Sequence, residues 1–340
     1  MAMETAGFTY GSDTSGLVWG FLFGRTAQPL ALDSNAAQAW LDTPHPPHEF
    51  VWLHFNLSHA ACERWLQTHT SLAAEFYETL HQGSRSTRIE QAENTLIAVV
   101  NDVVHNFSFE ASDIATMWSS VAQNLVITAR RAPLQSIERL RQAVLKNHEP
   151  IRSSVELLIH LLRDQADVLV NIVRDAVARV DDIEDHLLSG RLTPKRSDLG
   201  AMRRVLVRLQ RLLAPEPAAL FRLLQRPPSW ISELDSLELR QSTEEFSVVL
   251  SDMSSLQERI KLLQEEIAAS VNEGNNRSLF VLTIVTVLAL PINIIAGMLG
   301  MNVGGIPLAQ HPQGFWIIVA LIVTFTVVAG WIVARIQRNN

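Results

Sequence analysis

The chain has 340 residues, enough for one soluble domain of ordinary size and a small membrane part. Three of its 28 basic residues lie after Glu273 and no acidic residue does, so the first 273 residues carry 25 positive and 35 negative side chains. This net charge of −10 argues against nucleic acid as a partner and suits a domain that handles cations. The single Cys62 excludes a disulfide framework and a thiolate zinc cluster within one chain.

Residues 1–133 are predicted to form a cytoplasmic α/β domain. Short runs of aromatic and β-branched residues bounded by Gly and Pro indicate strands at Leu17–Phe23 and 49–55. Helices are expected at 35–41 and at 60–80, the second with Ser58 as its N-cap. Further strands are expected at residues 87–90, 95–100, 113–119 and 124–129. The pattern predicts a sheet of about five to seven strands flanked by helices.

Residues 134–276 are predicted to form a stalk or funnel of long helices, because apolar residues there recur every three to four positions. The first helix should end at Gly190, and Thr193-Pro194 should start the next, which covers 199–213. Four prolines predict a break after it: Pro215, Pro217, Pro227 and Pro228. A third helix, 235–274, should run unbroken into the apolar stretch that follows. The fold expected is thus α+β with a helical funnel.

Two apolar stretches near the C-terminus are long enough to cross a membrane. The first occupies 277–302, with no charged residue from Ser278 to Leu299, and the second occupies 315–335. Arg277 precedes the first stretch, whereas Arg335 and Arg338 follow the second, and the loop 303–314 has no Lys or Arg. The positive-inside rule therefore places both termini, including the tail 336–340, in the cytoplasm and this loop outside, in the periplasm.

The polar and small residues of the first stretch fall on one helical face. A seven-residue repeat selects Asn276, Leu279, Thr283, Thr286, Leu290, Asn293, Gly297 and Gly300. Polar groups in a membrane usually face a bundle interior or a water-filled path, so this face is predicted to line an ion path. Packing of small residues and hydrogen bonding between helices would produce the same face. Two membrane helices per chain cannot enclose a path, which implies a homo-oligomer.

The same repeat continues toward the N-terminus and places Glu258 and Glu265 on the side of the path. Around an axis of several copies these glutamates would form stacked acidic rings, which concentrate cations in cation channels. The alternative is two exposed glutamates on a solvated helix. Pro291 removes one backbone donor within the stretch and permits a local kink.

Gly300-Met301-Asn302, at the outer end of the first membrane stretch, resembles the hallmark tripeptide of the CorA magnesium transporter family. With two C-terminal spans and an N-terminal α/β domain, the resemblance covers essentially the whole chain. It implies a homopentamer in a bacterial inner membrane, with the tripeptide as the outer filter. The residues Met-Asn-Val-Gly-Gly-Ile-Pro from Met301 are similar to the zinc transporter (ZntB) branch. That similarity implies zinc uptake coupled to a proton gradient; magnesium, cobalt, nickel and cadmium are the alternative ions.

The chemistry of the filter does not by itself select zinc. Carboxamide and carbonyl oxygens suit hard, hydrated divalent ions, whereas zinc prefers nitrogen and sulfur. The spans contain no His, Cys, Asp or Glu that could bind bare zinc or relay a proton, and His311 in the outer loop is the nearby imidazole. The ion is thus a transported substrate, and no resident cofactor is expected.

Other clusters have weaker functional interpretations. The histidines His45, His48, His54 and His59 could form a soluble metal site, and the acidic run 181–185 could bind divalent ions or form a solvated helix face. The sequence contains no P-loop, nucleophile elbow or zinc protease motif, so an enzyme is not expected. The remaining alternative is a scaffold protein whose spans only anchor it in the lipid bilayer.

Overall fold

The computed structural model describes residues 11–26, 28–46, 48–82, 87–146, 151–189, 196–301 and 311–339. Two compact units make up the chain, Met1–Gln264 and Glu265–Asn340.

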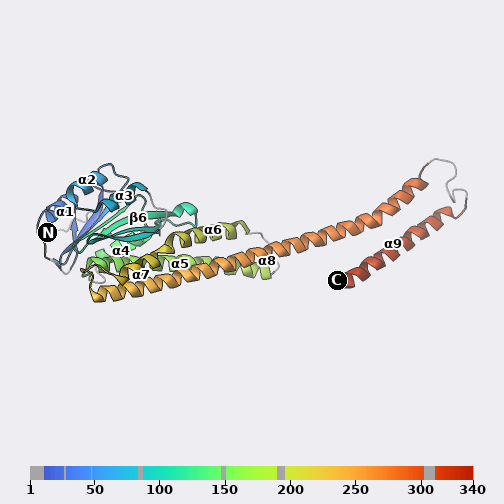
Figure 1. Cartoon of the computed structure of the whole chain (residues 1–340). Coiled ribbons are helices and arrows are strands. Elements are labelled where there is room, and N and C mark those ends of the chain that lie inside the picture. The colour runs from blue at the N-terminus through green and yellow to red at the C-terminus, as the bar shows by residue number, and fades with distance from the viewer. Residues whose placement is uncertain are drawn as a thin grey trace. The chain divides into compact units, whose positions relative to one another are not determined.

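A seven-stranded mixed sheet forms the centre of the first unit, with the order β2-β1-β3-β7-β6-β5-β4 (Figure 1). Only the central pair β3 and β7 is parallel, and the other neighbours pair antiparallel. The strands are β1 Leu17–Phe23, β2 Leu30–Leu32, β3 Phe50–Asn56, β4 Arg88–Ala92, β5 Thr95–Val103, β6 Ile114–Val121 and β7 Leu125–Arg130. The expected sheet is confirmed, with the short edge strand β2 as an addition.

Helices cover both faces of this sheet (Figure 1). Helices α1 (Ser34–Leu41), α2 (Cys62–His69) and α3 (Ala74–Gln82) share one hydrophobic core with one face. Helices α4 (Gln135–Lys146), α5 (Ser154–Leu188) and α7 (Pro215–Gln225) share the second core with the opposite face. Because the second core joins strand residues such as Trp52 to α5 residues such as Leu158, the sheet and the helices after residue 134 stabilise one another.

The single helix predicted at 60–80 is wrong, because two helices, α2 and α3, occupy that segment. The chain leaves α2 at Thr70, which is extended, and the Thr70 hydroxyl donates to the Leu66 carbonyl at 2.6 Å. A threonine that bonds back to the preceding turn satisfies a terminal carbonyl and favours a helix end. Ser58 does not cap α2 either, since its hydroxyl donates to the Arg131 carbonyl at 3.4 Å and Ala61 occupies the N-cap.

The break predicted after residue 213 is confirmed, because α6 (Arg196–Leu213) ends there and Ala214 separates it from α7; Pro215 and Pro217 lie in the first turn of that next helix. The N–H groups of the first helical turn have no partner within the helix, so a proline, which has no N–H, loses no hydrogen bond there. Proline can therefore start a helix as well as stop one. Pro227 and Pro228 do follow the end of α7 at Gln225. Gly190 and Thr193-Pro194, the predicted boundary between α5 and α6, lie outside the described residues.

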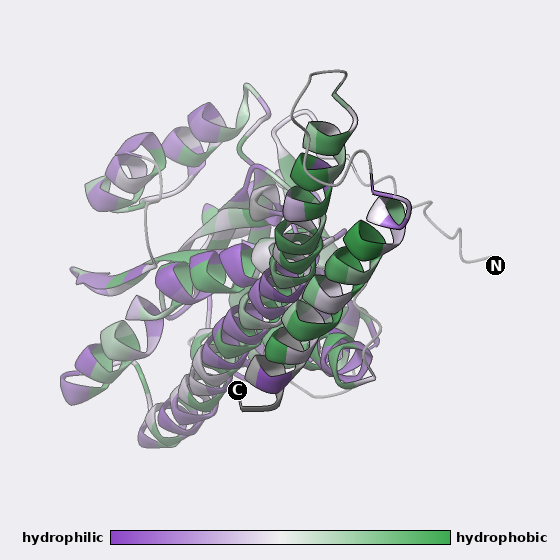
Figure 2. Cartoon of the chain, turned by 90° about the vertical axis from the view of Figure 1, so that its right-hand side faces the viewer, coloured by the Kyte–Doolittle hydropathy of each residue, from purple (hydrophilic) through white to green (hydrophobic). Residues whose placement is uncertain are grey.

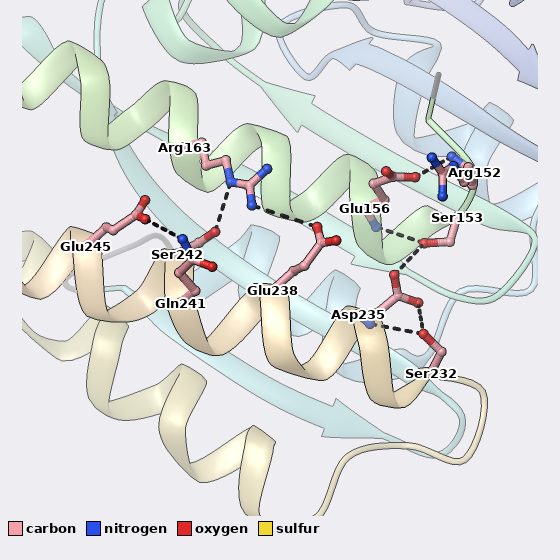
Figure 3. A network of polar contacts seen from close by, with 10 residues as sticks. All are labelled: Arg152, Ser153, Glu156, Arg163, Ser232, Asp235, Glu238, Gln241, Ser242 and Glu245. Atoms are coloured by element: carbon pink, nitrogen blue, oxygen red, sulfur yellow. Dashed lines mark hydrogen bonds and ion pairs between the residues drawn. The ribbon is translucent and has the colours of Figure 1, made fainter. Parts of the chain in front are cut away.

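A polar network fixes the start of helix α8 (Glu233–Leu299) against α5 within the first unit (Figure 3). Ser153 caps α5 by accepting from the Glu156 N–H at 2.9 Å, and its hydroxyl donates to Asp235 Oδ1 at 3.2 Å. Two turns further on, Arg163 donates to the Ser242 hydroxyl at 3.2 Å and pairs with Glu238 at 3.7 Å. Contacts at two heights along both helices fix their register.

The second unit holds the two apolar helical segments, the last turns of α8 and helix α9 (Gly314–Asn339). Both are long and apolar enough to cross a membrane, and Figure 2 shows their hydrophobic colouring. Helix α8 is one element of 67 residues with Pro291 inside it, so the prediction of a helix that runs unbroken into the first span is confirmed.

Candidate ion path along helix α8

Helix α8 presents the predicted path-lining residues at its surface. All eight are exposed in the chain: Asn276, Leu279, Thr283, Thr286, Leu290, Asn293, Gly297 and Gly300. Five partly covered residues of the span recur instead at Ile284, Leu288, Ile292, Ile295 and Leu299, and Ala289 and Pro291 are partly covered as well. At about 100° per residue these two sets lie on opposite sides of the helix. The chain therefore leaves the polar face of the span free for water or for another copy.

Threonine hydroxyls on this face bond to their own helix. The Thr283 hydroxyl donates to the Leu279 carbonyl at 2.8 Å and the Thr286 hydroxyl donates to the Leu282 carbonyl at 2.9 Å. A polar side chain inside a membrane needs such a partner, because no water is present in the hydrocarbon to replace it. These two hydroxyls thus have their partner within the helix.

Two glycines on this face have different surroundings. A Cβ at Gly297 would meet nothing within 4 Å, whereas a Cβ at Gly300 would lie 3.2 Å from the Ala296 carbonyl oxygen. Gly300 follows the last residue of α8, and its N–H donates to that carbonyl at 2.9 Å. Contacts within the chain therefore explain why position 300 holds a small residue. They do not explain why position 297 does.

The predicted outer filter is described in part. Gly300 and Met301 follow α8, with Met301 exposed, whereas Asn302 and the loop 303–310 lie outside the described residues. His311 precedes α9, and its Nδ1 accepts from the Gln313 N–H at 3.2 Å, which leaves Nε2 available to a metal ion. Contact of His311 with the ion stays a prediction.

The glutamates predicted for the funnel lie exposed on α8, opposite the buried residues Met253, Ile260 and Ile267. A positively charged side chain that the sequence analysis did not consider lies beside them: Lys261 Nζ is 3.6 Å from Glu258 Oε2. At about 100° per residue Lys261 lies about 60° around the helix from Glu258 and about 40° from Glu265, on the same side of α8. Each copy would thus bring two negative charges and one positive charge. Projecting the basic residues onto the helix would have found it.

The other predicted metal clusters do not assemble among the described residues, where no three potential ligands of the types His, Cys, Asp and Glu come together. His45 stacks on the Trp40 ring at 3.6 Å, whereas His54 is fully buried elsewhere, with Nδ1 2.8 Å from the Thr128 hydroxyl. In the run 181–185, Asp181 pairs with Arg259 of α8 at 2.7 Å, and Glu184 also pairs with Arg259. The acidic run therefore holds α5 to α8.

His54 gives a prediction on pH. Burial, followed by the charges of Arg130 and Arg141, lowers the pKa of His54 well below 6.5, and Arg130 donates to its Nε2 at 3.1 Å. Because only the unfolded chain takes up this proton near pH 6.5, His54 should lower the free energy of unfolding below that pH by about 1.4 kcal/mol per pH unit, measured as the difference between the native protein and His54→Gln, since the buried carboxyl of Glu216 contributes the opposite slope. Denaturant unfolding from pH 7.5 to 5 measures it. The variant His54→Gln should lose that slope, and an equal slope would contradict the assignment.

A three-layer α/β domain followed by two helices that are long and apolar enough to cross a membrane, the first with an uncharged polar face, is an architecture typical of two-span membrane proteins. The chain belongs to the family described as CorA-like Mg2+ transporter protein, whose model matches residues 47–335. Members of this family transport ions and are not enzymes.

Several proteins resemble the chain over most of its length. The divalent cation transporter CmaX of Pseudomonas aeruginosa is 27% identical over 96% of this chain and 97% of its own. The zinc transport protein ZntB of Pectobacterium atrosepticum is 24% identical over 84% of this chain and 86% of its own. The solved structure of full-length CmaX matches with a TM-score of 0.80 at 25% identity, covering 96% of this chain and 99% of that one.

The fold is shared more widely. The structure of the CorA magnesium transporter from Methanocaldococcus jannaschii matches with a TM-score of 0.73 at 18% identity, over 92% of this chain and 96% of that one. The family is therefore the one that Gly300-Met301-Asn302 indicated, whereas the preference for the zinc branch stays a prediction, because a divalent cation transporter of another name is as similar.

Proposed function

We propose that this chain assembles into a homopentamer in a bacterial inner membrane, with both termini in the cytoplasm, and carries divalent cations through a central path. The observation that supports this best is the polar face of α8, which the chain leaves exposed opposite its partly covered face. Asparagine amides exposed to lipid are costly, so a water-filled axis shared by several copies is the natural environment of Asn276 and Asn293. The outer filter would be formed by Gly300, Met301 and Asn302.

Zinc is the first candidate ion and magnesium, cobalt, nickel or cadmium the second group. The similarity to ZntB supports zinc, whereas the family description and the similarity to CmaX support divalent cations more broadly. The neutral oxygens expected at the filter favour an ion that keeps its water shell. Zinc would then cross as a hydrated ion.

A proton gradient is the proposed driving force. The two spans contain no ionisable residue between Ser278 and Leu299 or between Phe315 and Ala334, so no proton relay of side chains crosses the hydrocarbon. The gradient would act at the ends of the path, where His311 is a titratable group on the outer side.

Metal uptake into liposomes that contain the purified full-length protein tests the ion and the driving force together. Zinc and magnesium are compared, each with and without a pH gradient. We expect zinc uptake that the gradient increases. Magnesium uptake without zinc uptake would contradict the choice of ion, and an unchanged rate for Asn302→Ala would contradict the filter.

Cysteine substitution tests whether the exposed face meets water. The native Cys62 is buried, and burial raises the pKa of its thiol to about 12, so it does not react. A positively charged thiol reagent should modify Thr286→Cys and reduce flux about tenfold or more, because only a thiol in water ionises. The matched control Val285→Cys is exposed in the chain but turned toward lipid by about 100°. Equal modification of both variants would contradict the proposed path.

A further inference from the structure

A buried group of polar side chains lies where α7 and α5 meet the edge of the sheet. Glu216, in the first turn of α7, is fully buried, and Gln165 of α5 is 2% exposed. Thr87, next to β4, and Asn101 of β5 complete the group, with the Asn101 amide 3.4 Å from the Thr87 hydroxyl. This site lies in the soluble unit, and the ion path does not use it.

The orientation of the Gln165 amide follows from its partner. Its Nε2 lies 2.9 Å from the backbone carbonyl oxygen of Asn101, which can only accept a hydrogen bond, so the nitrogen must occupy that position. The same Nε2 also donates to Glu216 Oε2 at 3.4 Å. The amide oxygen therefore occupies the other position, and it can only accept.

Two buried oxygen atoms are left without a donor. Gln165 Oε1 and Glu216 Oε1 are both inaccessible to solvent and have no hydrogen-bond partner. They belong to two side chains that already share one hydrogen bond through their other atoms. Buried polar atoms without partners are rare and costly, so an explanation is required.

We propose that Glu216 is a proton-binding site, a neutral carboxylic acid at cytoplasmic pH that donates from Oε1 to Gln165 Oε1. A single proton thereby gives both orphaned oxygens a partner. The acid and the amide then form a closed pair, with Gln165 Nε2 donating to Glu216 Oε2 and the acid proton returning to the amide oxygen.

The surroundings of Glu216 favour the neutral form. Burial is the largest effect and, with the negative charge of Asp102 on β5, raises the pKa of Glu216 to about 8, although hydrogen bonds from Gln165 and Thr87 oppose the shift. Among the described residues, Asp102 is the charged side chain that affects the pKa of the Glu216 carboxyl. The N-terminus of α7 favours an anion, but that effect is smaller than the desolvation of a fully buried charge.

The site makes the attachment of α7 depend on pH. When Glu216 releases its proton to water, the negative charges of Glu216 and Asp102 are both buried in the first unit. Gln165 Oε1 then also loses its hydrogen-bond donor. Because the pKa is higher in the folded chain than in the unfolded chain, the stabilisation is complete below pH 4.5 and is lost as pH rises through about 8. An alkaline cytoplasm should therefore loosen α7 from β4.

Thermal unfolding of the full-length protein from pH 6 to 9, compared with Glu216→Gln, tests the proposal. The glutamine amide reproduces the closed pair without a titratable proton. We expect Tm of the native protein to fall with pH, by an amount that corresponds to about one proton released per chain on unfolding, and Tm of the variant to stay level. An equal fall in both proteins would overturn the proposal.

Infrared spectroscopy gives a measurement that does not depend on the variant folding. With glutamate labelled by carbon-13, the native protein at pH 7 should show the carbonyl stretch of a protonated glutamic acid, and this band should lose about half its intensity near pH 8 and disappear as the pH rises further. Absence of the band at pH 7 would overturn the proposal. Neither experiment measures transport, so failure here and failure of the proposed function are distinguishable.

Discussion

Replacing Gly297 by Phe is expected to abolish metal flux while the protein still folds and inserts. A Cβ added at Gly297 meets no atom within 4 Å apart from the backbone of its own helix, so the substitution should not disturb the folding of one copy. Around a shared axis, the copies would together place a ring of phenyl groups in the path. Such a hydrophobic constriction expels water and blocks ions, so we expect a loss of flux of about a hundredfold in liposomes.

The second membrane helix supplies a matched control. Gly330 of α9 is also a glycine with no atom within 4 Å of the added Cβ, but it does not lie on the polar face of α8. The variant Gly330→Phe should retain most of the flux at equal protein density in the liposomes. Equal losses in both variants would mean that Gly297 serves helix packing and does not line a path.

Removing the two funnel glutamates is expected to have the next largest effect. In Glu258→Gln/Glu265→Gln the positive Lys261 loses its partner at 3.6 Å and stays on the same face. Each copy then changes from a net charge of about −1 to about +1 on that face, and the ring repels cations. Charge of this kind changes ion encounter rates by about tenfold or more at low salt, so uptake should fall about tenfold in low salt and less in 0.5 M salt.

The control removes the same charge from other faces of the same helix. Glu245 and Glu266 are exposed on α8, and at about 100° per residue both lie well away from Glu258 and Glu265. The variant Glu245→Gln/Glu266→Gln should transport at nearly the native rate. A salt-independent loss, or the same loss in both double variants, would show that net charge and not an acidic ring is responsible.

Long periodic segments were the predictable part of this fold. The apolar repeat through α8 specified its register from the soluble unit into the first span, and the structure confirms both the helix and the exposure of Glu258 and Glu265. Strands with aromatic and β-branched residues, such as β1 and β3, were equally clear. In these segments many residues agree on one period, so a single exception does not change the prediction.

The end of α2, the start of α7 and buried polar pairs were not predictable. Thr70 ends α2 through a hydrogen bond to the turn before it. Pro215 opens α7 because it stands in the first turn of a new helix. Both residue types occur inside and at the ends of helices, so their meaning depends on neighbours in space. The pair of Gln165 and Glu216 joins residues 51 positions apart, and no period in the sequence connects them.

The threonines of α8 have one more consequence, for the sign of the ion. Thr283 and Thr286 each commit their single hydroxyl proton to a carbonyl one turn earlier. What such a hydroxyl can still offer to the outside is the lone pairs of its oxygen, because it has no second proton to donate. In the proposed assembly an anion, which needs donors, would find none in the two threonine hydroxyls of each copy, whereas the water shell of a cation presents its protons outward and would be accepted. In the proposed path, selection by sign of charge would therefore start in the hydrogen bonds of a single helix, before the proposed filter distinguishes one metal from another.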